Sequence, residues 1–399
     1  MARRLLYLWL LSLWTLSWGG PAEAEQYDMD FPGVNSILPI VTRPANASRI
    51  FYGVMFDAGS TGTRIHVYTF IQKDRAELPV LDNEMFQSVK PGLSAYADMP
   101  ERGGDTVRQL LKVAKRTVPR LEWKRTPVVL RATAGLRLLP EGKARALLKQ
   151  VHEVFEESPF FVPDNSVSIM DGTNEGILAW VTVNFLTAAK RQWEPWIWVA
   201  DQPRSPSSPN LSYLGNGLKA ARLATLGALG AEGLEWRVFT SSCLPKKFQE
   251  DWTFGGITYK VSGVEDGSAG FKPCYEEVLK VVKGIVHQPL ELKGGSIFYA
   301  FSYYFDRAVD AGLIDGSEGG AIEVRDFKKR AKEVCTKKAK YRTVSPFLCM
   351  DMTYITCLLK EGFGFKENTV LQLTKKVNNV EASWALGATF DYFQKLNIR

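Results

Sequence analysis

A string of small, hydroxylated and charged residues carries the strongest chemical signal in the sequence. The string D-A-G-S-T-G-T-R occupies residues 57–64 and follows the apolar residues 54–56. A carboxylate at the end of a strand can hold a hydrated divalent cation, so Asp57 is the candidate metal residue, acting through water. Glycines let backbone N–H groups close on phosphate oxygens, and hydroxyls add further donors. The alternative is a glycine- and serine-rich hairpin that binds nothing. The expected phosphate-binding residues are Gly59, Ser60, Thr61, Gly62, Thr63 and Arg64.

Two further strings begin where an apolar run ends. In R-A-T-A-G-L-R, residues 131–137, small residues permit close backbone approach, and Thr133 with Arg137 is suited to orient a nucleophile or a phosphate. In M-D-G-T-N-E-G, residues 170–176, Glu175 opens a helix, where a carboxylate can accept a proton from a water attacking phosphorus in line. The alternatives are helix-to-sheet packing for the first string and a carboxylate that complements a helix N-terminus for the second.

Together the three strings resemble the first three conserved regions of the apyrase, or ecto-nucleoside triphosphate diphosphohydrolase, family. They are most similar to its soluble branch, the uridine diphosphatases of the endoplasmic reticulum. Supporting strings occur at residues 88–93, 180–184, 299–304 and 377–387, the last of which matches the fifth conserved region. The resemblance covers about residues 52–188 and 211–399.

The resemblance implies an α/β fold of two ribonuclease H-like lobes, of the actin and sugar-kinase type, with the active site in the cleft between them. It implies that Ser60 and its loop hold the terminal phosphate and that Asp57 holds Ca²⁺ or Mg²⁺ through water. Thr133 would help to place the attacking water, and Glu175 would be the general base. Two aromatic residues are candidates for stacking on the nucleobase or, alternatively, for packing in a core: Tyr303 and Tyr304.

The hydrophobic pattern places these residues on alternating strands and helices. Such alternation favours an α/β sheet with ligands at the strand ends. The pattern predicts strands over 54–56, 65–69, 128–130 and 167–170, and helices over 105–118, 140–155, 175–188, 217–229 and 379–396. The predicted domains are a signal peptide at 1–24, an N-terminal lobe at 25–190, an atypical linker at 191–210, and a C-terminal lobe at 211–399 whose final helix returns to the N-terminal lobe.

The linker stands where the family has its second phosphate loop. That loop reads D-L-G-G-A/G-S-T-Q and follows the helix of the third region, and no such string occurs in this sequence. Residues 191–210 instead contain three tryptophans followed by a segment rich in proline and serine. Asp201 is a poor substitute, because Gln202 and Pro203 supply no glycine and remove an N–H donor. We therefore expect the second lobe to be incomplete.

The N-terminus indicates the secretory pathway. Residues 1–24 combine two arginines, an apolar run and an A-E-A cleavage site, a pattern typical of a signal peptide. The apolar run is too short to keep the mature chain anchored in a membrane. Asn46 and Asn210 are glycosylation acceptors in form. The predicted location is the lumen of the endoplasmic reticulum, the extracellular space, or both.

All five cysteines lie in the second half of the chain, and an oxidising compartment allows them to pair. Several pairings are possible, and short loops favour Cys243 with Cys274 and Cys335 with Cys349. Cys357 lies in an apolar run and is expected to be a buried free thiol.

The charge and the histidine content exclude other classes of protein. The formal net charge of +7 is spread along the chain, so we expect no nucleic-acid partner. The three histidines have no metal-ligand spacing, so any bound metal is expected to have oxygen ligands, and the resemblance implies Ca²⁺ or Mg²⁺ as the cofactor. The leading hypothesis, implied by the resemblance, is a nucleoside diphosphatase that removes the terminal phosphate of UDP or GDP and so supports secretory-pathway glycosylation. The alternatives are a catalytically inactive, splice-type variant with weak or no nucleotide binding and, by fold analogy alone, a sugar kinase or chaperone-type ATPase. The sequence sets no oligomeric state.

Overall fold

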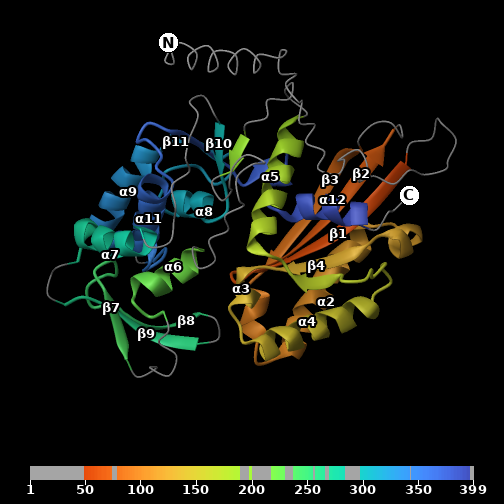
Figure 1. Ribbon diagram of the computed structural model, residues 1–399, viewed down its shortest axis with the longest axis horizontal. Coiled ribbons are helices and arrows are strands. Elements are labelled where there is room, and N and C mark those ends of the chain that lie inside the picture. The colour runs from red at the N-terminus through yellow and green to blue at the C-terminus, as the bar shows by residue number, and fades with distance from the viewer. Residues whose placement is uncertain are drawn as a thin grey trace, which may run out of the picture.

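The computed structural model describes most of the chain between residues 49 and 395. Figure 1 shows two lobes side by side, each with its own sheet, and the last helix of the chain lying in the first lobe. The predicted signal peptide, Asn46, Asn210 and most of the predicted linker lie outside the described residues. The described ranges are 49–73, 79–188, 197–199, 217–229, 237–254, 257–265, 269–283, 297–341 and 343–395.

The first lobe contains a five-stranded sheet in the order β3-β2-β1-β4-β5. The strands β1, β2 and β3 pair antiparallel, whereas β1, β4 and β5 run parallel. This is the strand order of a ribonuclease H-like lobe, as the resemblance implied. Because the parallel strands end at one edge of the sheet, the strings that follow β1, β4 and β5 meet there. The strands are β1 (Arg49–Ala58), β2 (Thr63–Gln72), β3 (Val80–Val89), β4 (Val128–Ala132) and β5 (Val167–Ile169).

Helices cover both faces of this sheet (Figure 1). On one face lie α2 (Pro100–Thr117) and α4 (Glu141–Glu156), whose buried residues recur at helical spacing and form one core with the sheet. On the other face lie α5 (Gly172–Ala188) and α12 (Ala385–Lys395), the final helix. The contact between α5 and α12 is close, because a Cβ added to Gly387 would lie 2.1 Å from the carbonyl oxygen of Leu178.

Two predicted helices begin at residues that differ clearly from the predicted ones. Helix α2 begins at Pro100 rather than residue 105, since proline is well suited to the first helical position, where its missing N–H is not needed. The final helix begins at Ala385 rather than residue 379, because the preceding residues form the short hairpin of β13 (Lys376–Val377) and β14 (Val380–Glu381).

The second lobe contains a four-stranded sheet in the order β11-β12-β10-β6. Strand β10 pairs parallel with both β6 and β12, and β11 is antiparallel at the edge. Every residue of helix α11 is buried, so this helix is the centre of the second core. The strands are β6 (Ile197–Val199), β10 (Ile297–Ala300), β11 (Gly320–Glu323) and β12 (Val370–Leu373). The helices are α6 (Leu218–Thr225), α7 (Phe271–Lys283), α8 (Tyr303–Asp310), α9 (Val324–Thr336), α10 (Lys338–Tyr341) and α11 (Leu348–Cys357).

Strand β6 falls inside residues 191–210, where a linker was predicted, and the rest of that segment lies outside the described residues. Isoleucine, tryptophan and valine favour strands, and β10 supplies the backbone partner. The parallel set β6, β10 and β12 repeats the arrangement of β1, β4 and β5 in the first lobe. In the first lobe β1 also pairs with β2, whereas within the described ranges β6 has a partner on one side only. The described part of the second lobe therefore has a smaller sheet than the first.

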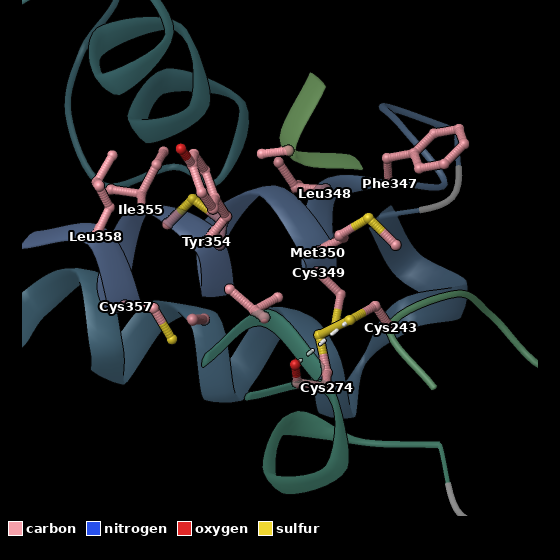
Figure 2. Close-up of a cluster of buried hydrophobic side chains, with 14 of the residues drawn as sticks. Cys243, Cys274, Phe347, Leu348, Cys349, Met350, Tyr354, Ile355, Cys357 and Leu358 are labelled. Atoms are coloured by element: carbon pink, nitrogen blue, oxygen red, sulfur yellow. Dashed lines mark hydrogen bonds between the residues drawn. A yellow bond between two sulfur atoms is a disulfide. The ribbon is translucent and has the colours of Figure 1, made fainter. Parts of the chain in front are cut away.

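Both predicted disulfides are confirmed, and both lie in the second core. Figure 2 shows the disulfide between Cys243 and Cys274. Cys243 is bonded to Cys274 and Cys335 to Cys349, and the Sγ atoms of Cys274 and Cys349 lie 3.9 Å apart. Cys357 is a buried free thiol, as expected. Burial raises its pKa to about 12, so the thiol stays protonated and unreactive at neutral pH.

The remaining elements are short. A small sheet in the order β7-β9-β8 lies in the second lobe beside α6 and α7 (Figure 1). Among the described residues, no helix has the length and apolar character needed to cross a membrane. These elements are β7 (Val238–Ser241), β8 (Gln249–Phe254), β9 (Ile257–Gly263), α3 (Ala134–Arg137), two 3₁₀ turns at Leu93–Tyr96 and Arg120–Arg125, and a π-helical turn at Leu358–Gly362.

Candidate active site

The predicted phosphate loop is the tight turn between β1 and β2. The two strands pair as far as Ala58 and Thr63, and the N–H of Gly59 donates to the carbonyl of Gly62 at 3.1 Å. Ser60 is half-buried and Thr61 is exposed, so the tip of the turn can be reached from solvent. The strand pairing thus presents a short run of backbone and hydroxyl donors at the edge where the parallel strands end.

Two glycines from elsewhere in the chain hold this turn in place. A Cβ on Gly92 would lie 2.1 Å from the carbonyl oxygen of Gly59, and a Cβ on Gly135 would lie 2.8 Å from the Cα of Ser60. No larger residue fits at either position without displacing the turn. Gly135 belongs to the second string and Gly92 to the supporting string at residues 88–93. Those strings therefore contribute the packing that fixes the loop.

Thr133 lies beside the start of the loop. It is buried, its N–H donates to the carbonyl of Ala58 at 3.2 Å, and it precedes the short helix α3. The N–H of Met170 donates in turn to the carbonyl of Ala132 at 2.8 Å, which joins the third string to the second. The backbone thus brings all three predicted strings to one edge of the first sheet.

Glu175, the predicted general base, lies in the first turn of α5 and forms an ion pair with Arg137. The Nη2 of Arg137 lies 2.6 Å from Oε2 of Glu175, and the two side chains are 15% and 34% exposed. Arg137 was expected to orient a nucleophile or a phosphate, whereas the structure places it against the carboxylate. The guanidinium fixes the orientation of that carboxylate, which is still open enough to meet a water molecule.

Asp57 has the environment of a cation ligand. Its carboxylate is buried, and Oδ2 accepts a hydrogen bond from Nη1 of Arg64 at 2.5 Å. Within the described residues, Oδ1 of Asp57 and Oγ1 of Thr63 are buried without a hydrogen-bond partner. Buried polar atoms of this kind need a partner, and carboxylate oxygen is the donor that Ca²⁺ and Mg²⁺ prefer. The residues present therefore fit an oxygen-bound divalent cation, held directly or through water.

The two candidate base-stacking residues have different environments. Tyr304 is 1% exposed in the core of the second lobe, so its ring offers no free face to a nucleobase, and the core-packing alternative holds for this residue. Tyr303 is only partly buried, and its ring stacks on Tyr304 with centroids 4.4 Å apart. Of the pair, only Tyr303 remains a candidate for contact with a ligand.

One residue at the loop was missed by the sequence analysis. Lys219, at the start of α6 in the second lobe, donates from Nζ to the carbonyl oxygen of Ser60 at 3.4 Å. Lys219 follows the Y-L-G-N-G-L string at residues 213–218, which resembles the family's sequence. Nothing in that string indicates that Lys219 faces the first lobe. Only the folded arrangement shows that the second lobe brings a cation to the turn.

Two α/β lobes, with a glycine-rich loop, a buried carboxylate and an oriented glutamate at one sheet edge, define an enzyme that acts on phosphate groups. The chain belongs to the GDA1/CD39 (nucleoside phosphatase) family, which it matches over residues 44–194 and 210–399. The gap between the matched ranges falls within residues 191–210, the predicted linker. The family resemblance and the hydrolase class expected from the sequence are both confirmed.

Known relatives agree with this assignment. The chain is 58% identical to ectonucleoside triphosphate diphosphohydrolase 5 of Gallus gallus, covering 91% of this chain and 92% of that protein. It is 55% identical to the human nucleoside diphosphate phosphatase ENTPD5 (89% and 90% covered) and 45% identical to human ectonucleoside triphosphate diphosphohydrolase 6 (88% and 79%). A crystal structure of nucleoside triphosphate hydrolases from Neospora caninum has the same fold, with a TM-score of 0.55, 11% identity, and 89% and 94% coverage.

Proposed function

We propose that this chain hydrolyses the terminal phosphate of nucleoside diphosphates, UDP and GDP, with Ca²⁺ or Mg²⁺ as cofactor. The observation that carries the proposal is the ion pair between Arg137 and Glu175 at the sheet edge where Gly92 and Gly135 fix the phosphate loop. The human relative is named a nucleoside diphosphate phosphatase, which supports the choice of a diphosphate substrate.

In the proposed reaction, different residues bind the phosphate, accept the proton and hold the cation. The loop from Gly59 to Arg64 binds the terminal phosphate through backbone N–H groups and hydroxyls. Glu175 accepts a proton from the attacking water, which Thr133 helps to place, as the water oxygen bonds to phosphorus. The bond from phosphorus to the bridging oxygen breaks, and the nucleoside monophosphate leaves. A divalent cation held by Asp57, through water, neutralises phosphate charge when it is bound.

We also infer a place for this activity in the secretory pathway. The pattern of residues 1–24 and the two disulfides support an oxidising compartment. Nucleoside diphosphates are released there when sugars are transferred from nucleotide sugars, so their removal would support glycosylation. The site is suited to recognise nucleoside diphosphates rather than a partner protein.

Phosphate release tests the proposal directly. The purified mature chain with intact disulfides is assayed with UDP, GDP and the corresponding triphosphates, each with Ca²⁺ or Mg²⁺. We expect diphosphate hydrolysis that Glu175→Gln lowers by about a hundredfold or more, because the variant lacks the proton acceptor. Glu276→Gln, at an exposed position on α7, is the matched control and is expected to keep full activity.

Two results would contradict the proposal. One is a Glu175→Gln variant that hydrolyses UDP as fast as the wild type. The other is a folded, monodisperse wild-type chain that releases no phosphate, which would instead support the inactive-variant hypothesis, since the second phosphate loop is missing from the sequence.

A further inference from the structure

Lys219 links the second lobe to the phosphate loop of the first. It lies in the first turn of α6, and its Nζ donates to the carbonyl oxygen of Ser60, which is 159 positions away in the sequence. The contact is long, at 3.4 Å, and joins a full positive charge to a neutral acceptor. A half-buried ammonium group at this position can also contact an anion that rests on the same turn.

The cationic side chains around Lys219 add positive charge near the loop. Arg222, one turn further along α6, binds the buried carboxylate of Asp351 at 2.7 and 2.6 Å. Lys90 follows β3, and its side chain reaches within 3.9 Å of a Cβ built on Gly62. Burial, followed by repulsion from Arg222 and Lys90, lowers the pKa of Lys219 from its ordinary value. An anion beside Lys219 would relieve this repulsion.

Two further charges beside the loop, Arg64 and Asp57, neutralise each other. Arg64 forms an ion pair with Asp57 at 2.5 Å. Lys219, by contrast, donates to a neutral carbonyl rather than to a carboxylate.

We propose that Lys219 is a second-lobe ligand for the phosphate groups of a nucleotide bound on residues 59–64, an inference that rests on the proposed function. A lysine ammonium is a compact charge that phosphate oxygens readily accept as a hydrogen-bond donor. Lys219 thus supplies a positive charge to the substrate from the second lobe. The sequence of this chain lacks the second phosphate loop. The Ser60 carbonyl holds the side chain at the turn until phosphate takes its place.

Nucleotide binding and turnover by three variants test this role. Lys219→Met removes the charge, Lys219→Arg retains it, and Lys280→Met alters an exposed lysine of α7 as the matched control. We expect Lys219→Met to weaken binding of UDP with Ca²⁺, and to raise its KM, by about tenfold to a hundredfold with a smaller change in kcat. Lys219→Arg is expected to restore most of the affinity, and uridine, which has no phosphate, is expected to bind all variants equally.

The outcomes separate this inference from the proposed function. If the wild type hydrolyses UDP and a folded Lys219→Met variant binds UDP equally well, the inference is wrong and the proposed function stands. If the wild type binds UDP in a Lys219-dependent way but releases no phosphate, the inference stands and the proposed activity is wrong. A wild type that binds no nucleotide overturns the inference, as does equal weakening of uridine and UDP. Should Lys219→Met not fold, Lys219→Gln is used in the same comparison.

Discussion

The guanidinium of Arg137 determines how the carboxylate of Glu175 faces the site. Arg137 lies in α3 and Glu175 in the first turn of α5, so their 2.6 Å contact fixes two elements relative to each other as well as one side chain. A general base must be held within hydrogen-bond reach of the water it deprotonates, and a displacement of about 1 Å can cost a hundredfold in rate. Arg137 is therefore a positioning residue for the proposed reaction.

Substitution of Arg137 by methionine tests this role. We expect kcat for UDP to fall by about a hundredfold while KM changes little, because the carboxylate loses its orientation but the phosphate loop is kept. Arg137→Lys is expected to recover part of kcat. Arg145→Met, which breaks an exposed pair with Glu141 on α4, is the matched control in the same steady-state assay. Equal losses for Arg137→Met and Arg145→Met would contradict the assignment.

In this sequence the residue types indicated phosphate chemistry. They did not indicate which side chains would be exposed or which would pair with each other. The loop at residues 57–64 was recognisable because glycines, hydroxyls and a carboxylate follow an apolar run. The pairing of Arg137 with Glu175 was not, because it joins residues 38 positions apart whose side chains meet only after the sheet forms. Tyr303 and Tyr304 are alike in sequence, and only the fold distinguishes the buried ring from the partly buried one.

Among the elements, three strands of the first lobe meet at a buried histidine. His66 on β2 lies 2.7 Å from Glu84 on β3 and 3.5 Å from Glu381 on β14. The N–H of Glu381 also donates to Glu84 at 2.6 Å. Burial alone lowers the pKa of His66, but the hydrogen bond to Glu84 and the charges of Glu381, Glu84 and Asp57 raise it above its ordinary value. These contacts join the returning C-terminal segment to the first sheet.

The raised pKa of His66 makes the stability of this junction depend on pH. Because protonated His66 is favoured in the folded state, its stabilisation is fully present below about pH 6.5 and is lost as pH rises through the folded-state pKa. We expect the free energy of unfolding of the wild type to fall by about 1–3 kcal/mol more over this rise than that of His66→Gln. Denaturant unfolding measured from pH 6 to pH 9 provides the comparison, with His152→Gln as control, since the side chain of His152 is 44% exposed. Parallel curves for wild type and His66→Gln would refute the coupling.

For the whole molecule, the alternation of strands and helices predicted an α/β sheet, and the resemblance to the apyrase family implied two lobes. The sequence did not predict that Ile197–Val199 would form a strand within the atypical segment. That strand depends on β10, which lies about a hundred residues further on, so no local pattern could establish the pairing. The disulfides were predictable, since their cysteines are close in sequence and the loops that they close are short.

The two lobes are expected to differ in local stability because their first parallel strands have different neighbours. Strand β1 pairs with β2 on one side and β4 on the other, whereas β6 pairs only with β10 within the described ranges. Amides exchange slowly when their hydrogen bonds open only on global unfolding, and an edge strand opens more easily. Peptide-level hydrogen exchange is therefore expected to show faster exchange for β6 than for β1. Equal protection would mean that another segment or a second copy of the chain covers the open edge of β6, and the two lobes would then be equally complete in solution.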